Sequence, residues 1–307
     1  MSESRLLIVT PVRNEAAHIG LVAAGLAAQT RPPDLWLVVD DGSEDETPLI
    51  LGRLQREHPF MRVVTTPPDF TAAATDRLAV AAAPRAFNYG LSTIETDELM
   101  RFTHIGKLDG DIELLPSYFE RLLDELDANP RLGIVGGVIL EEHGLGWEPR
   151  LGAPEHVRGA LKLYSRDCLG AIGGVWEWLG WDGIDEVLAR MNGFETRSFE
   201  PARARHHRHT GSADGRLRGH VRWGEAHWIL HHGLPWTVAR AGKVAGTRPR
   251  GVSAFAYLYG YGRAAARRVP RVDVDGYRQF VRAEQRRRIG SALRRSLGSR
   301  RRAASGV

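Results

Sequence analysis

Two aspartates separated by one glycine stand in the segment Lys107-Leu108-Asp109-Gly110-Asp111. In extended backbone, residues two apart point to the same side, so the carboxylates of Asp109 and Asp111 can converge on one point. Two carboxylates that close repel each other unless a cation lies between them or one of them is protonated. A Mg²⁺ or Mn²⁺ ion held by these carboxylates and a diphosphate would remove the repulsion. The alternative is a solvent-exposed turn with separated carboxylates.

Two other polar clusters follow apolar stretches nearer the N-terminus. One is the sequence TPVRNE at positions 10–15, and the other is DDGS at positions 40–43. A carboxylate at the end of a strand can accept hydrogen bonds from a ribose or from the N–H of a base. Gly42 allows a tight turn that brings backbone close to a ligand. The same residues are also common in simple turns, so DDGS by itself does not separate the two interpretations.

The elements around these clusters alternate between strand and helix. The alternation predicts an α/β fold with a mostly parallel sheet and helices on both faces, and ligands bind such sheets beyond the carboxyl ends of the strands. We expect Asn14 to cap the first helix, the acidic residues 44–46 to lie in the first turn of the second, and Pro116 to begin a later one. The expected strands are 6–10, 35–39, 61–65, 102–108 and 132–140, and the expected helices start at 14, 44, 84 and 116.

The order of these motifs resembles that of the family 2 glycosyltransferases. Pro-x-x-Asn-Glu, Asp-Asp-Gly-Ser and Asp-x-Asp follow successive strands, and RAFNYG at positions 85–90 is similar to the Arg-Asn-x-Gly segment of that family. The similarity covers about residues 5–210. It implies a GT-A-type, Rossmann-like fold and a hexosyltransferase-like, metal-dependent, inverting transfer of a sugar. Processive members carry Gln-x-x-Arg-Trp, whereas Gly219 replaces the glutamine before Arg222-Trp223 here, so a non-processive enzyme is expected.

The resemblance also implies roles for single residues. Asp40 is the expected contact to the base, and Asp109 and Asp111 belong to the metal–diphosphate site, with Asp111 the expected direct ligand of Mn²⁺ or Mg²⁺. A divalent cation would stabilise the charge of the departing diphosphate more in the transition state than in the ground state. Either His206 or His207 is a further candidate, and we place His206 in the metal set, with a polar strand end as the alternative. The full set implied for donor binding is Thr10, Pro11, Asn14, Glu15, Asp40, Asp41, Arg85, Asn88, Lys107 and Asp109.

An inverting transfer needs an ionised general base within hydrogen-bond reach of the acceptor hydroxyl. Family members carry a Glu-Asp pair at the start of a helix that contains an arginine and ends near a glycine. Counting back from that glycine places Asp182 at the aspartate position, with Trp181 where glutamate is usual. Counting back from Arg190 favours Asp185 or Glu186. Asp182 is our first candidate for the base and Asp185 the second, and the alternative for Asp182 is a helix N-cap.

Composition limits the remaining choices. The chain has 307 residues, 43% of them hydrophobic and 26% charged, which is ordinary for a globular protein. Its single cysteine, Cys168, excludes a disulfide scaffold and a cysteine-built zinc cluster. The sequence shows neither a signal-peptide pattern nor a stretch long and apolar enough for a membrane span. We therefore expect a cytoplasmic protein, peripheral at most to the cytoplasmic face of the membrane.

Positive charge is concentrated near the C-terminus. Residues 263–302 hold 14 arginines against three acidic residues, a local balance of +11 in a chain of net charge +5, so the remainder carries −6. Positions 281–297 are typical of a basic amphipathic helix, which could rest on an anionic membrane or pack on the catalytic domain. We expect a nucleotide-sugar-binding catalytic domain at 1–215 and a helical extension at 216–307 with a basic, partly disordered tail.

The predicted function is transfer of one sugar from a nucleotide-diphosphate-sugar donor to a carbohydrate or lipid-linked acceptor, in surface polysaccharide or glycolipid synthesis. The alternative is a nucleic-acid or anionic-surface binding protein that acts through its arginine-rich tail. That alternative leaves Asp40, Asp109, Asp111 and Asp182 without a role. For this reason no nucleic-acid partner is expected.

Overall fold

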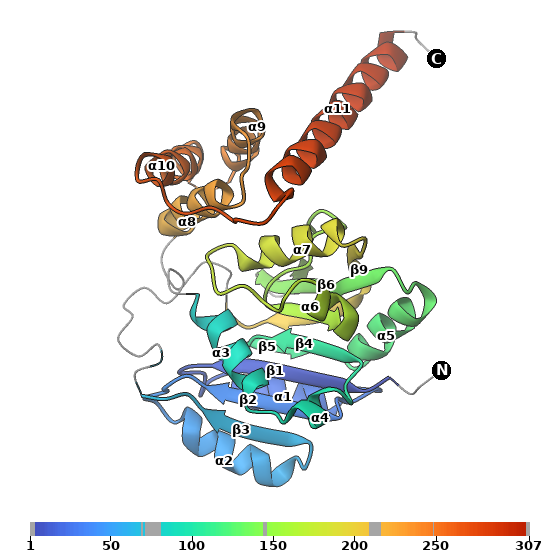
Figure 1. The fold of residues 1–307 in the computed structure, drawn as a ribbon, viewed down its shortest axis with the longest axis vertical. Helices are drawn as coiled ribbons and strands as arrows, with labels where there is room; N and C mark the ends of the chain where they lie inside the picture. The colour runs from blue at the N-terminus through green and yellow to red at the C-terminus, as the bar shows by residue number, and fades with distance from the viewer. Residues whose placement is uncertain are drawn as a thin grey trace. The chain divides into compact units, whose positions relative to one another are not determined.

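The computed structural model describes residues 4–68, 70, 81–143, 146–208, 216–247 and 249–304, with the backbone alone at 216 and at 292–304. The chain divides into two compact units, Met1–Thr210 and Gly211–Val307. In Figure 1 the first unit is a sheet with helices around it, and the second is helical.

The sheet of the first unit is mixed. Its strands run in the order β3-β2-β1-β4-β8-β6-β9-β5, and β7 pairs with β6. The four strands from β3 to β4 are parallel, whereas β8 is antiparallel to both β4 and β6. The bounds are β1 Leu6–Val12, β2 Leu35–Asp40, β3 Met61–Thr65, β4 His104–Leu108, β5 Ile112–Leu114, β6 Leu132–His143, β7 Gly146–Pro149, β8 Leu161–Ser165 and β9 Glu195–His206. The predicted α/β class is confirmed. The antiparallel strand pairs were not predicted, because the strand–helix alternation in the first half of the chain indicates only parallel strands.

Helices cover both faces of this sheet because its inner strands are apolar on both sides. Leu6, Ile8 and Trp36 belong to one core cluster with side chains of α1, α2 and α5. The alternate residues Val9 and Val39 face α3, which lies so close at Gly90 that an added Cβ would be 2.6 Å from a Val39 methyl. The bounds are α1 Ile19–Ala27, α2 Thr47–Glu57, α3 Ala82–Ser92, α4 Thr96–Leu99, α5 Tyr118–Ala128, α6 Arg166–Ala171 and α7 Trp181–Met191.

Asn14 joins two loops instead of capping a helix, so its predicted capping role is wrong. The helix α1 begins at Ile19, and Asn14 has φ 55°, a left-handed conformation that asparagine tolerates. Its backbone N–H donates to Ser43 Oγ at 2.9 Å, and its Oδ1 accepts from Glu44 N at 2.8 Å. Asn14 therefore fixes the loop after β1 to the loop after β2.

Two other helix starts differ from the prediction. The helix α2 begins at Thr47, after the acidic residues, and Asp45 Oδ1 accepts from Thr47 N at 2.9 Å. The helix α5 begins at Tyr118, with Ser117 as its N-cap, so Pro116 lies before the helix and not in its first position. In both places a short turn separates the end of the strand from the start of the helix.

The C-terminal unit is built from α8 Arg216–Ile229, α9 Leu234–Val244, α10 Val252–Ala266 and α11 Tyr277–Ala304. The helices α8 and α10 pack through glycines. A Cβ at Gly224 would lie 2.0 Å from Tyr257 O, and one at Gly260 would lie 1.9 Å from Val221 O. Beside this crossing, His227 Nδ1 and the Tyr257 hydroxyl share a hydrogen bond of 2.5 Å.

Gly260→Ala is expected to lower the free energy of unfolding by about 1–3 kcal/mol, because the new methyl group meets backbone that cannot move aside. Gly262→Ala is the matched control, since a Cβ there meets nothing within 4 Å. That variant should be neutral or stabilising by up to about 1 kcal/mol, from helix propensity. Denaturant unfolding of the full chain measures both changes. Equal stability of the two variants would show that the backbone contact is not tight.

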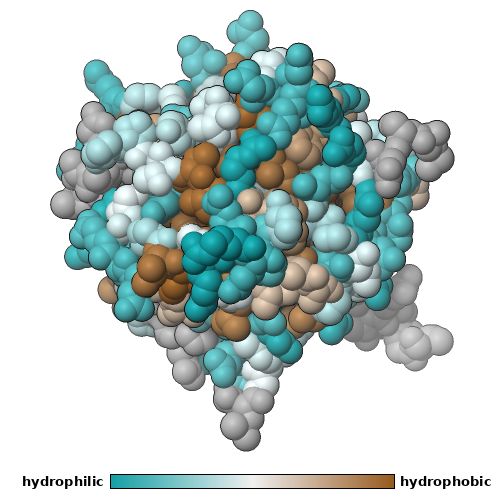
Figure 2. All heavy atoms as spheres, turned by 90° about the horizontal axis from the view of Figure 1, so that it is seen from below, coloured by the Kyte–Doolittle hydropathy of each residue, from teal (hydrophilic) through white to brown (hydrophobic). Residues whose placement is uncertain are grey.

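No helix in the described part of the chain is long and apolar enough to cross a membrane. On the face shown in Figure 2, hydrophobic patches lie between hydrophilic residues.

Candidate active site at the carboxyl ends of the strands

The DDGS sequence forms a buried turn at the end of β2. Asp40 Oδ1 accepts from Ser43 N at 3.0 Å, and Gly42 has φ 72°. Asp41 Oδ1 accepts from the Thr66 hydroxyl at 3.0 Å. Both aspartates are buried. The turn interpretation is therefore observed, and the turn holds the two carboxylates in fixed positions beside the end of β1.

The residues predicted from β1 divide between the core and the loop. Thr10 is fully buried, and its hydroxyl accepts from Trp36 Nε1 at 2.9 Å, so this side chain stabilises the sheet from within. Pro11 is half-buried near the end of the strand. Glu15 N donates to Thr47 Oγ1 at 2.8 Å, which ties the loop after β1 to the start of α2.

A cluster of charged side chains lies where β5 and β9 meet the loop after β1. Arg208 Nη2 donates to Glu15 Oε2 at 2.7 Å, and Arg208 Nε lies 3.7 Å from Asp111 Oδ2. His206 Nε2 lies 3.4 Å from the same Asp111 oxygen, and His18 Nδ1 lies 3.2 Å from Glu15 Oε2. Arg208 therefore supplies a cation between two carboxylates, Glu15 and Asp111, which both belong to the predicted site.

The two carboxylates of this cluster titrate differently. Burial raises the pKa of Glu15, and Arg208 opposes that rise only in part. Burial also acts to raise the pKa of Asp111, but the hydrogen bond and charge of His206, together with the charges of Arg208 and His18, outweigh it, so the pKa lies below its ordinary value. Asp111 is thus held as a carboxylate, the form that binds cations.

Asp109 and Asp111 have separate partners, because residues 109–111 form a turn and not extended backbone. Ile112 N donates to Asp109 O at 3.3 Å across that turn. Asp109 pairs with the buried Lys107 ammonium, which also donates to Gly159 O at 3.0 Å. The expectation that both carboxylates converge from one extended strand is wrong. Each has its own cationic neighbour.

The fit of a divalent cation rests on Asp111 and His206. Within the described residues, no three histidine, cysteine or acidic side chains are grouped as a metal site. Mg²⁺ and related ions commonly use one or two protein ligands together with substrate phosphates and water. The Asp111 and His206 donor atoms are 3.4 Å apart, close to the spacing of about 3 Å expected for neighbouring ligands of one octahedral ion. The pair would fit an ion that takes its remaining ligands from a bound phosphate group and water.

Arg85 and Asn88 on α3 contact the loop before α7. Asn88 Nδ2 donates to Val175 O at 2.8 Å and to Glu177 Oε1 at 3.1 Å. Arg85 Nε lies 3.7 Å from Glu177 Oε2. These two residues therefore fix the segment that leads into α7, and the contacts of the described chain do not join them to the β1 and β2 loops.

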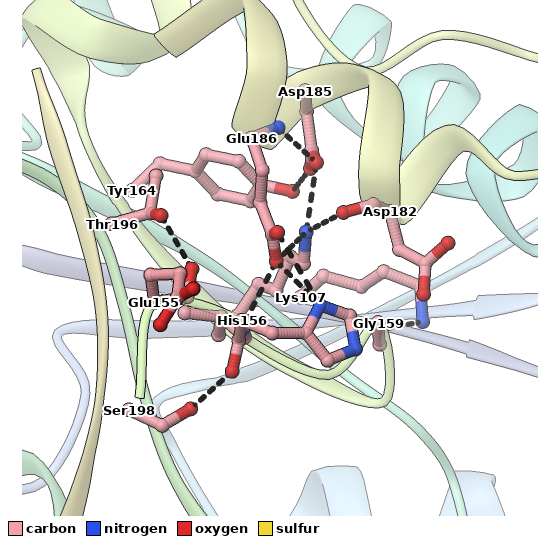
Figure 3. Close-up of polar contacts among 12 residues, drawn as sticks. Lys107, Glu155, His156, Gly159, Tyr164, Asp182, Asp185, Glu186, Thr196 and Ser198 are labelled. Carbon is pink, nitrogen blue, oxygen red and sulfur yellow. Dashed lines mark hydrogen bonds and ion pairs between the residues drawn. The ribbon is translucent and has the colours of Figure 1, made fainter. Parts of the chain in front are cut away.

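Asp185 lies inside a closed polar network (Figure 3). Its Oδ1 accepts from Lys162 Nζ at 2.8 Å and from Glu186 N at 2.7 Å, and its Oδ2 accepts from the Tyr164 hydroxyl at 2.5 Å. Lys162 and Asp185 are fully buried. Burial raises the pKa of Asp185 to about 6, although the Lys162 ammonium acts against the rise. An acceptor hydroxyl has no route to this carboxylate.

Asp182 has a different position, in the first turn of α7. The helix begins at Trp181 with Gly180 as its N-cap, so Asp182 is not the cap. Its backbone carbonyl accepts from Lys162 Nζ at 2.6 Å, while its side chain is half-buried. Figure 3 shows its carboxylate pointing away from Asp185. Lys162 therefore binds the backbone carbonyl of Asp182 and not its carboxylate.

Lys162 and Arg208 are the residues that sequence analysis missed. The chain has three lysines against 39 arginines, and Lys107 and Lys162 are both buried beside Trp181. Their ammonium groups lie 5.2 and 5.4 Å from the centre of a Trp181 ring, within the range of cation–π attraction. The rarity of lysine in the sequence was the one feature that could have drawn attention to Lys162. Arg208 stood in the His206–His209 run, but nothing in the sequence pointed to its two carboxylate partners.

The chain belongs to glycosyl transferase family 2, whose sequence profile matches residues 7–171. Among solved structures, it is similar to the mannosyltransferase PcManGT of Pyrobaculum calidifontis in complex with GDP-Man and Mn²⁺, at 19% identity and a TM-score of 0.53, over 95% of this chain and 87% of that one. It is also similar to S. aureus TarS 1–349 in complex with UDP-GlcNAc, at 12% identity and a TM-score of 0.52, over 85% of this chain and 73% of that one. No curated protein matches the sequence. The GT-A-type fold is confirmed.

Proposed function

We propose that the protein is an inverting, non-processive glycosyltransferase. It would move one sugar from a nucleotide-diphosphate-sugar donor to a hydroxyl of a carbohydrate or lipid-linked acceptor, in surface polysaccharide or glycolipid synthesis. The observation that carries the proposal is the placement of Asp111, His206 and Arg208 beside the loop that follows β1. The GDP-Man and UDP-GlcNAc complexes of the similar structures support a nucleotide-sugar donor.

In this proposal the donor lies against the loops after β1, β2 and β4. Asp40 and Asp41 are fixed by the turn they form and would accept hydrogen bonds from the nucleoside. Lys107 and Asp109 form an ion pair near the end of β4 and would meet the diphosphate side of the donor. Pro11, Asn14 and Glu15 shape the wall between these loops, and Thr10 supports it from within the core.

Asp111 and His206 are the residues that would hold Mn²⁺ or Mg²⁺. When bound, the ion would stabilise negative charge on the departing nucleoside diphosphate. Arg208 lies 3.7 Å from the same Asp111 oxygen and adds a fixed guanidinium, which is suited to bidentate contact with phosphate. In this proposal Arg208 would add positive charge beside the leaving group.

We assign the general base to Asp182 and not to Asp185. A base must reach the acceptor hydroxyl and must be ionised near neutral pH. The half-buried Asp182 is partly accessible to an acceptor, whereas both Asp185 oxygens are occupied by buried partners. In this assignment Asp182 takes the proton from the hydroxyl as the hydroxyl oxygen attacks the anomeric carbon. The bond from that carbon to the diphosphate oxygen breaks on the opposite side.

Calorimetric titration with a panel of nucleoside diphosphates, in Mn²⁺, Mg²⁺ or chelator, tests the donor site. We expect one nucleotide to bind in a metal-dependent manner. Asp111→Asn should weaken that binding at least about 100-fold, since changes even in the outer shell of metal sites cost about 10–100-fold. Asp124→Asn, the same chemical change on the exposed side of α5, should bind normally. Absence of binding under all conditions would overturn the proposal.

A further inference from the structure

The helix α10 exposes a stripe of large apolar side chains. Phe255 is 76% exposed and Tyr259 is 60% exposed, and Val252 and Leu258 lie on the same outward side. The opposite side of α10 packs against α8 through Tyr257 and its neighbours. The helix is therefore apolar on both sides, although only one of them contributes to the core of the C-terminal unit.

The helix α9, which packs against α10, also exposes large apolar side chains. Leu234 is 65% exposed and Val238, one turn later, is 61% exposed. Neither helix contains an aspartate or glutamate. Exposed apolar patches of this kind on soluble domains mark sites of interaction.

The charge of the C-terminal unit indicates what this surface binds. Residues 211–307 hold 21 arginine and lysine residues against five acidic residues, a formal balance of +16, which leaves −11 on the remainder of the chain. Exposed basic residues stand at the ends of these helices, with Lys243 near the end of α9, Arg250 just before α10, and Arg267 and Arg268 just after it. The same face of a second copy would carry the same high positive charge and would be repelled.

The first turns of α11, the long basic helix, do not add exposed apolar side chains to this surface. Tyr277 and Val281, in the first turns of α11, are buried in the unit. In the part of the C-terminal unit whose side chains are described, the largest exposed apolar and aromatic groups thus belong mainly to α9 and α10. Exposed basic residues stand at the ends of the same two helices, and apolar and basic residues occur together in helices that lie in a lipid interface.

We propose that the outward faces of α9 and α10 form a docking surface for an anionic lipid bilayer. Phe255, Leu258, Tyr259, Leu234 and Val238 would enter the boundary between headgroups and acyl chains, while the neighbouring arginines meet lipid phosphates. The inference goes beyond sugar transfer and does not depend on it. It requires only the helices of the C-terminal unit.

Cosedimentation of the full chain with phosphatidylcholine vesicles, with and without phosphatidylglycerol, tests the surface. We expect binding only to the anionic vesicles, weakened by salt. Phe255→Ser and Tyr259→Ser should each weaken partitioning roughly tenfold, the factor that burial of one large apolar side chain supplies. Leu49→Ser is the matched control, because Leu49 is 77% exposed on α2 of the catalytic unit. Equal loss of binding in the control would overturn the proposal.

A site-specific probe distinguishes insertion from simple charge attraction. The only cysteine, Cys168, is buried, and burial raises the pKa of its thiol to about 12, so it reacts poorly. Tyr259→Cys therefore gives selective attachment of an environment-sensitive dye, with Leu49→Cys as the control position. A blue shift on anionic vesicles at position 259 alone is expected.

Two outcomes would refute membrane docking by this face. The first is an unshifted dye at position 259 on vesicles that do bind the protein. The second is a dimer in sedimentation equilibrium, in the absence of lipid, that Phe255→Ser dissociates, which would make a second copy the occupant. Calorimetry of the Phe255→Ser variant separates this inference from the proposed function. We expect its metal-dependent affinity for nucleotide to equal that of the unchanged protein.

Discussion

Asp182→Asn is expected to reduce sugar transfer about 10²–10⁴-fold while leaving nucleotide-sugar binding intact. Asparagine keeps the shape of the side chain and cannot accept the proton of the acceptor hydroxyl. The backbone carbonyl at this position still accepts from Lys162, so the start of α7 should be preserved. Transfer rates under saturating donor and acceptor, together with donor affinity from calorimetry, measure the two effects separately.

A control for Asp182→Asn is available on a neighbouring helix. Asp167 lies in the first turn of α6 with an 85% exposed side chain, and Asp167→Asn makes the same chemical change away from the strand ends. It should transfer sugar at the normal rate. If Asp182→Asn retains full activity while donor binding is normal, the base is another residue.

Lys162→Met is expected to lower the free energy of unfolding by about 3–5 kcal/mol, the usual cost of removing one partner from a buried ion pair. The ammonium of Lys162 lies 2.8 Å from Asp185 Oδ1 and 3.5 Å from Glu186 Oε1, all three side chains being buried. Without it, the buried Asp185 carboxylate loses its ion-pair partner, whereas Glu186 keeps His156 at 3.0 Å and Arg190 at 3.9 Å. Denaturant unfolding followed by circular dichroism gives the change.

The defect should depend on pH in a defined direction. Burial raises the folded-state pKa of Asp185 to about 6, above its ordinary value of 3.8. The folded state therefore holds this proton more tightly than the unfolded chain, and the stability that the group contributes increases as the pH falls through that window. Since Lys162 opposes the rise of the pKa, its removal should extend the window upward. Lys162→Met should accordingly be less destabilised at about pH 5 than at about pH 8.

The double variant Lys162→Met/Asp185→Asn is the internal control for this ion pair. It removes one charge of each sign and keeps an amide that can bond to Tyr164. We expect it to be more stable than Lys162→Met alone, because the only carboxylate of the pair that remains is Glu186, which His156 still contacts at 3.0 Å. A double variant as unstable as the sum of the two single variants would mean that the residues act independently.

The sequence predicted the scaffold better than the contacts within it. Apolar runs ending in polar clusters placed the early strands correctly, because strand burial and the change to polar residues are local properties of the chain. The antiparallel strand β8 was missed, since its pairing with β4 and β6 depends on a distant return of the chain. Helix starts were misplaced at Asn14 and Pro116 because loop contacts, and not local capping preference, decide them.

For the candidate site, residue types were easier to predict than partners. His206 was expected near Asp111, and the structure brings them within 3.4 Å. Asp109 was expected to share a cation with Asp111, but a turn directs it to Lys107. The choice between Asp182 and Asp185 could not be made from spacing alone. Our proposal of Asp182 is based on burial, since two hydrogen-bonding partners from β8 occupy the Asp185 carboxylate.

Because the three lysines differ in burial, chemical modification of their amines can report whether the protein is folded. Lys107 and Lys162 are enclosed beside Trp181, whereas Lys243 is exposed on α9. An amine-directed reagent would therefore find one lysine side chain in the intact protein and two more whenever the strands β4 and β8 open. The number of modified lysines thus records local unfolding of the catalytic centre, without any engineered label.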